Sequence, residues 1–303
     1  MLGTLLQNVF NALQWGSFYS IIALGYCLVY GVLRFINFAH GDIFMTASYI
    51  AFFIATALLS LWAGGGVPVF IITIVLTMSL TALLGVSIER IAYRPLRQKG
   101  VNRLYVVITA LMVGFTLEYG NLALLGASAR RFPDIIAEKI WTFGPVIITN
   151  LKVLVIAAAF LVFAILQFIV KKTVLGMSMR AISNDRFAIP LMGIPVNKII
   201  TFTFALGSGL AAVAGILFGM SYPVLSPLMG MILGWKAFIA AVVGGIGDIR
   251  GAFFGGFMLG FIEIFIVAFF PSSFKDLVSF VILLIILVLR PTGFFGTAKS
   301  TKI

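Results

Sequence analysis

The chain has 303 residues, of which 62% are hydrophobic and 10% are charged, and its mean hydropathy is +1.17. This composition excludes a soluble globular protein, because long apolar runs leave too few polar residues for a water-exposed surface. A formal charge of +12 would suggest nucleic acid in a soluble protein, but here the Lys and Arg residues gather in a few loops, where they set orientation in a bilayer. We therefore expect one membrane domain over residues 1–303 and no nucleic-acid partner.

Apolar runs predict an all-α polytopic membrane protein with eight or nine transmembrane helices. The predicted spans are residues 9–33, 43–62, 68–89, 104–126, 152–170, 199–220, 233–247, 251–270 and 276–290. The seventh run, 233–247, is short and rich in glycine, so it either crosses the membrane or re-enters it. The first basic side chain is Arg34, so we expect no cleaved signal peptide. The single cysteine, Cys27, lies in an apolar run and can form no internal disulfide.

A polar motif, Ile36-Asn37-Phe38-Ala39-His40-Gly41-Asp42, separates the first two runs. At membrane depth, its polar residues would face a cavity or a partner, because ionisable groups are costly there. At the cytoplasmic surface, it would be a capped turn with Asp42 favourable near the start of the next helix, and we favour this second interpretation. One histidine without a cysteine pair supplies too few ligands for a metal site.

Further polar residues interrupt later apolar runs: Glu118 and Asn121 in the fourth, Lys236 in the seventh and Glu263 in the eighth. Each either lines a pathway through the membrane or pairs with a neighbouring helix. The candidate residues for a translocation path are therefore Asn37, His40, Asp42, Glu118 and Lys236.

Two loops are strongly basic, one between the third and fourth runs and one between the fifth and sixth. The positive-inside rule places both in the cytoplasm and the N-terminus outside. The basic tail, with Lys299 and Lys302, then favours nine crossings, since an odd number returns it to the cytoplasm. Residues 127–151 should lie outside although they include basic side chains.

Small residues recur at four-residue spacing in two strips. One strip holds Gly207, Ala211, Gly215 and Gly219, and the other holds Gly247, Gly251 and Gly255 beside Gly256 and Gly260. Such strips let helix backbones approach closely, so we expect these helices to pack against protein.

The segment 171–198, KKTVLGMSMRAISNDRFAIPLMGIPVNK, is a polar and basic insertion between two apolar runs. Its charges and loop backbone must lie outside the hydrocarbon. Pro190 should break a helix, so we predict two short helices on the membrane surface. A solvated basic loop held at anionic lipid is the alternative interpretation.

Several familiar chemical motifs are absent. No Gly-x-x-x-x-Gly-Lys-Ser/Thr segment exists, so the chain has no P-loop for ATP. No His-Glu-x-x-His or paired-cysteine arrangement is present, and the lone histidine leaves little for a nucleophile and base. We therefore expect no catalytic residue, no metal and no cofactor in this chain, and no enzyme activity.

Short motifs along nearly the whole chain resemble the membrane permeases of branched-chain amino acid ABC importers. They are Gly25-Tyr26 and Tyr30-Gly31, the motif at 36–42, Ile88-Glu89-Arg90, Ala92-Tyr93-Arg94-Pro95, Lys236-Ala237-Phe238, Ala240-Ala241-Val242-Val243-Gly244-Gly245-Ile246-Gly247 and Arg290-Pro291-Thr292-Gly293. Each motif is weak alone, but their order is specific. Asp42 departs from the glutamate of many relatives and keeps the carboxylate.

The resemblance implies an inner-membrane subunit of a bacterial importer, with a homologous second permease, two ATPase subunits that bind the ATP, a periplasmic binding protein and membrane lipid as partners. It also implies that segment 171–198 is the ATPase-docking loop, with Gly176, Arg180, Ala181, Asn184 and Asp185 matching the family pattern. A rigid surface helix carrying these residues would transmit ATPase closure to the adjoining spans. Related permeases for urea or short amides, and a passive channel or secondary carrier, are the alternatives.

Overall fold

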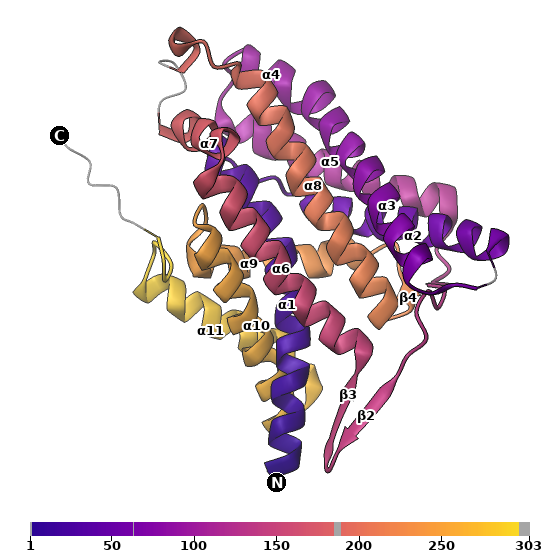
Figure 1. Ribbon diagram of the computed structural model, residues 1–303. Helices are drawn as coiled ribbons and strands as arrows, with labels where there is room; N and C mark the ends of the chain where they lie inside the picture. The colour runs from indigo at the N-terminus through magenta and orange to yellow at the C-terminus, as the bar shows by residue number, and fades with distance from the viewer. Residues whose placement is uncertain (1, 63, 185–188, 297–303) are drawn as a thin grey trace.

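The computed structural model describes residues 2–62, 64–184 and 189–296. It is a helical bundle (Figure 1). Its long helices are α1 (Leu2–Leu33), α2 (His40–Leu61), α3 (Gly66–Ile88), α5 (Arg103–Leu125), α6 (Asn150–Lys172), α8 (Val196–Ser221), α9 (Met229–Gly245), α10 (Ile249–Phe269) and α11 (Lys275–Leu289). Within the described ranges, eight helical segments are long and apolar enough to cross a membrane, which confirms the polytopic all-α prediction.

Shorter elements join these helices. A π-helical turn (Glu89–Tyr93) and α4 (Arg94–Gln98) extend α3, and α7 (Val174–Asn184) with a 3-10 turn (Ile189–Met192) precedes α8. The strands β2 (Ile140–Phe143) and β3 (Val146–Thr149) form an antiparallel hairpin, and β1 (Arg130–Arg131) pairs antiparallel with β4 (Val224–Leu225). The hairpin was not predicted from the sequence, because the apolar-run criterion does not detect strands of this length.

The loops fall at two opposite ends of the bundle. Near the N-terminus, Gln7 of α1 hydrogen-bonds the backbone of Ile147 in β3, so this end holds the hairpin and the β1–β4 pair. At the other end, Arg34 after α1 donates to Ser183 of α7, and Arg97 of α4 donates to Asn197 of α8. Figure 1 shows the N-terminus and the hairpin at one end, and α4 and α7 at the other.

Helix α9 has only 17 residues, or about 25 Å, and it is not among the eight candidate spans. It begins within the bundle, where Gly230 lies against Gly41 and where Met229 lines a pocket with Trp15 and Phe218. Its last turn accepts hydrogen bonds from the backbone of Phe294 and Phe295 after α11, and Gly247, which follows it, lies beside Gly31 near the end of α1. The seventh run therefore leads from the interior to the end that holds α7, and the described end of the tail lies on the same side as both basic loops.

Helix α1 occupies the centre of the bundle, and glycines allow its neighbours to approach. Gly256 and Gly260 of α10 face the backbone of Ser20 and Gly16 of α1 so closely that a Cβ on either would overlap it. Gly255 on the same helix meets Ala240 of α9 in the same way. The predicted packing of the small-residue strips is confirmed at these positions.

Orientation in the bilayer is testable with single cysteines in a Cys27→Ala background. Ser183, a natural choice in the second basic loop, is half-buried and accepts a hydrogen bond from Arg34, so the exposed Lys198 is the better site. Cysteines at Gln98 and Lys198 should be labelled only from the cytoplasm, because the basic loops stay inside. A cysteine at the exposed Ile140, in the hairpin, should show the opposite pattern. Labelling of the Gln98→Cys or Lys198→Cys variant in intact cells would contradict the topology.

Candidate functional site

The motif at 36–42 lies inside the bundle. After α1 ends, Arg34 adopts a left-handed φ of +58°, and the chain returns so that α2 begins beside Gly25. A Cβ at Gly25 would overlap the ring of His40. This contact lies eight residues before the end of α1, or roughly 12 Å along the helix. The predicted surface position of this turn is therefore wrong, because glycines in the neighbouring helices leave room for the motif in the interior, but Asp42 does lie in the first turn of α2 as predicted.

Asn37 has a structural partner in this arrangement. Its side-chain oxygen accepts a hydrogen bond of 2.7 Å from the Tyr93 hydroxyl in the π-helical turn. The same turn begins with Glu89, which is fully buried and lies 2.6 Å from Arg94 and 3.0 Å from Arg97. These contacts fix the loop at the end of α3 against the motif, so Asn37 takes part in this packing.

Lys236 also has partners within the chain. Its ammonium on α9 lies 2.9 Å from Glu263 of α10 and 2.6 Å from Asp276 of α11. Lys275 lies 2.8 Å from the second oxygen of Glu263, and the Tyr19 hydroxyl donates to it at 2.8 Å. Of the two roles predicted for Lys236, the structure shows pairing with neighbouring helices.

Asp42 and Glu118 are brought together at one pocket of about 170 Å³ between α2, α5 and α9. Asp42 lies in the first turn of α2, and Glu118 projects from α5. His40 is buried behind the pocket, with its ring 4.8 Å from that of Tyr26, which lines the pocket. Of the five candidate residues for a path, Asp42 and Glu118 line this cavity, whereas Asn37, His40 and Lys236 do not.

The predicted docking segment contains α7, which lies directly after α6. Gly176 is buried against the carbonyls of Ile169 and Val170, where a Cβ would overlap them. Thr173 between the helices accepts a hydrogen bond from the Gly176 amide. Helix α7 is therefore held rigidly at the end of α6. This close contact explains why a glycine occupies position 176.

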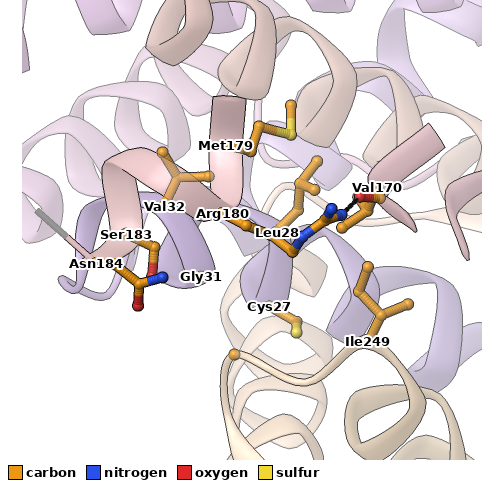
Figure 2. A pocket seen from close by; sticks show the side chains of 11 residues that line it. Cys27, Leu28, Gly31, Val32, Val170, Met179, Arg180, Ser183, Asn184 and Ile249 are labelled. Carbon is orange, nitrogen blue, oxygen red and sulfur yellow. Dashed lines mark hydrogen bonds between the residues drawn. The ribbon is translucent and has the colours of Figure 1, made fainter. Parts of the chain in front are cut away.

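Figure 2 shows the inner side of α7. A cavity of about 230 Å³ separates α7 from α1 and is lined by Asn184 and Cys27. Arg180 donates a hydrogen bond to the Val170 carbonyl at the end of α6. Ala181 packs against the core, and Asp185 lies outside the described residues. Arg180 thus has an intramolecular partner, which the sequence did not predict.

The exposed side of this segment is apolar. Val174 and Met177 of α7 are exposed, as are Leu191 and Met192 in the following 3-10 turn, with Leu191 at 89%. These residues lie between two candidate membrane spans rather than within one. Exposed apolar side chains outside the membrane indicate a surface that another molecule covers.

Comparison with known proteins supplies the family. Residues 8–287 match the model of the branched-chain amino acid transport system permease component. The chain belongs to this family. It is similar to the high-affinity branched-chain amino acid transport system permease protein BraD of Pseudomonas aeruginosa, with 40% identity over 98% of each chain. The LivH permease protein of Escherichia coli is 36% identical over 98% of this chain and 97% of its own. No solved structure matches.

Membership in this permease family makes the chain a multi-pass membrane transport protein, in agreement with its apolar helices. Sequence reasoning named Glu89 only as part of a motif and left the role of Glu263 open, whereas the structure pairs both with basic side chains. A signal for both existed, since each acidic residue in an apolar helix needs a cation nearby. The sequence does not give the distances that would identify which basic side chain lies beside each of these acids.

Proposed function

We propose that the chain is one permease subunit of an ABC importer for branched-chain amino acids in the bacterial inner membrane. The similarity of nearly the whole chain to BraD and LivH carries this proposal. Its partners would be a homologous permease, two ATPase subunits and a periplasmic binding protein. ATP would be bound by the ATPase subunits, and this chain would form one membrane domain that carries out no catalysis.

The exposed apolar residues of α7 and its neighbouring turn support a docking role for the segment. We define the docking surface as the exposed apolar residues Val174, Met177, Leu191 and Met192. Apolar anchors surrounded by polar groups are typical of protein interfaces. The ATPase is the partner that the family provides on this side of the membrane.

The contacts of α7 support transmission of movement from that surface. Gly176 and Thr173 hold α7 at the end of α6, and Ser183 accepts a hydrogen bond of 2.8 Å from Arg34 at the end of α1. A displacement of α7 would therefore move both helices as a rigid body.

Substitution of the apolar anchors tests the docking role. Met177→Asp with Leu191→Asp should cost about 2 kcal/mol or more of binding, because each change places a charge where an apolar side chain is buried on docking. We expect normal permease abundance, loss of the ATPase from the purified complex and no uptake of leucine. Charge reversal at Arg180 and Asp185 should have a smaller effect, since Arg180 is already bonded to Val170.

The matched control is Ile140→Asp, which changes an exposed apolar residue at the opposite end of the bundle. This variant should retain its ATPase. If the anchor variant keeps its ATPase and imports leucine at the wild-type rate, the segment is better described as a loop at the lipid surface. If wild-type uptake proceeds without any associated ATPase, the protein is a carrier.

The substrate needs its own measurement, because a permease for another substrate also resembles this chain. The ribose import permease protein RbsC of Haemophilus influenzae is 25% identical over 97% of this chain and 87% of its own. Uptake of leucine, isoleucine and valine by the reconstituted complex should exceed that of ribose and of urea. If uptake of ribose or urea exceeds that of the three amino acids, the chain belongs to an importer for another class of substrate.

A further inference from the structure

The pocket between α2, α5 and α9 contains an unusual pair of acids. Asp42 is 8% exposed and Glu118 is 4% exposed, and both line the pocket. Neither forms a hydrogen bond or an ion pair with another side chain in the described parts of the chain, and the Oδ1 of Asp42 is buried without a partner. A buried carboxylate is costly unless a cation or a donor compensates it.

The other buried acids of this protein are compensated by its own side chains. Glu89 has Arg94 and Arg97 within 3.0 Å, and Glu263 has Lys236 and Lys275 within 2.9 Å. In contrast, none of the described residues that line the Asp42 pocket is Lys, Arg or His. A cation that enters the pocket from outside the chain would compensate these carboxylates.

Glycines give the pocket its shape. A Cβ at Gly114 of α5 would lie 2.6 Å from Oδ2 of Asp42, and a Cβ at Gly230 of α9 would lie 2.9 Å from Oδ1. Three aromatic residues also line it: Phe38 and Trp235, whose rings lie 5.2 Å apart, and Phe115, which is exposed. The lining thus combines two carboxylates with apolar rings.

This combination of groups identifies the class of occupant. A bare metal ion takes several oxygen ligands, whereas the described side chains of this lining offer only the two carboxylates and the Tyr26 hydroxyl. An ammonium group is satisfied by carboxylates and by the faces of aromatic rings. An aliphatic chain attached to it would lie against Phe38, Phe115 and Trp235.

We propose that this pocket binds the transported amino acid during its passage, with Asp42 and Glu118 accepting its ammonium group. The proposal rests on the proposed function and names a contact site within it. The aliphatic side chain of the substrate packs on the aromatic rings, and its carboxylate lies toward the open side of the pocket. The two carboxylates therefore select for a free amino group.

Photolabelling of the purified complex tests this assignment directly. The probe is a leucine analogue that carries a diazirine in its side chain, and mass spectrometry locates the labelled peptides. In wild-type complex, label should appear on α5 and α9 near Phe115 and Trp235. An excess of leucine or of 3-methylbutylamine, which keeps the ammonium, should prevent labelling. An excess of 4-methylpentanoate, which keeps only the carboxylate, should not.

Neutral variants isolate the carboxylates. Asp42→Asn and Glu118→Gln should each reduce pocket labelling and leucine uptake about tenfold, and the double variant should abolish both. Folding should be retained, because the described structure gives these carboxylates no side-chain partner to lose. The control Glu138→Gln removes an exposed carboxylate elsewhere and should label normally. ATPase retention during purification verifies assembly of every variant.

A volume change supplies a second, independent test. Gly114→Ala should displace the Asp42 carboxylate and reduce labelling, since its Cβ meets that group before any other. Gly120→Ala on the same helix has no neighbour within 4 Å and should behave as wild type. Comparison of these two variants distinguishes an effect of filling the pocket from a general effect of alanine in α5.

Several results would overturn the assignment. These are equal competition by 4-methylpentanoate, wild-type labelling of the double neutral variant, or no pocket label in a complex that imports leucine. Competition by sodium chloride but not by 3-methylbutylamine would assign the site to an inorganic cation instead. Failure of the wild-type complex to retain ATPase or to import leucine would contradict the proposed function, and is measured separately from the labelling.

Discussion

Replacement of Gly255 by leucine should prevent α9 and α10 from packing and should abolish assembly of the importer. A Cβ at this position would overlap the carbonyl of Ala240 and would lie 3.1 Å from the Cα of Gly244. Backbone atoms form both contacts, so no side-chain rotation relieves them. Extra methylenes in a packed interior cost about 1–3 kcal/mol, and a leucine against backbone should exceed this range. We expect loss of the monodisperse complex in size-exclusion chromatography and no leucine uptake.

The control for this change is Gly120→Leu in α5, where a Cβ would have no neighbour within 4 Å. Both substitutions add the same side chain to a glycine in an apolar helix, so only the neighbours differ. Gly120→Leu should therefore assemble. Normal assembly and uptake of Gly255→Leu would show that α9 and α10 separate at this seam in the functional protein.

Removal of the Lys236 ammonium should strongly destabilise the bundle. The side chains of Lys236 and Glu263 are 7% and 1% exposed, so their ion pair is shielded from water. Breaking a buried pair costs about 3–5 kcal/mol because one charge is left uncompensated. Lys275 remains 2.8 Å from Glu263 and still compensates part of its charge. We therefore expect the loss of stability in Lys236→Met to lie near the lower limit of this range. Thermal unfolding of the detergent-solubilised protein measures the loss.

A double variant and a surface pair complete this experiment. Lys236→Met combined with Glu263→Gln should be less destabilised than the sum of the single changes, since the second removes the stranded charge. Arg131 and Asp134 form an exposed pair at 3.7 Å, so Arg131→Met should cost less than about 1 kcal/mol. Additive effects of the two buried substitutions would show that Lys236 and Glu263 do not interact.

The helices were predictable because a bilayer requires long apolar runs. Most predicted and observed spans agree within a few residues, as 199–220 does with α8 and 251–270 with α10, but α1 begins seven residues before the predicted span 9–33. The depth of the 36–42 motif was not predictable. It depends on Gly25 and Gly41, which admit His40 and the α9 backbone, and a linear sequence does not show which glycines face which helix.

The candidate site was only partly predictable for the same reason. A polar residue in an apolar run has two possible roles, and only distance separates them. Lys236 pairs with Glu263, 27 positions later in the chain, whereas Asp42 lies near Glu118 without a cation. In the docking segment, charge drew attention to Arg180, which is bonded to Val170, whereas the apolar Met177 and Leu191 are exposed.

The short connection from α1 to α2 has a thermodynamic consequence. Arg34 at one end of it is bonded to α7, and Asp42 shortly after its other end forms part of the pocket proposed to bind the amino acid. Few residues thus separate the helix that carries part of the proposed docking surface from the proposed substrate pocket. Coupling between two sites is reciprocal, so if ATPase docking shifts this connection and changes pocket affinity by some factor, substrate occupancy must change docking affinity by the same factor. Binding of an amino acid in the pocket would then change the affinity of the ATPase for the docking surface.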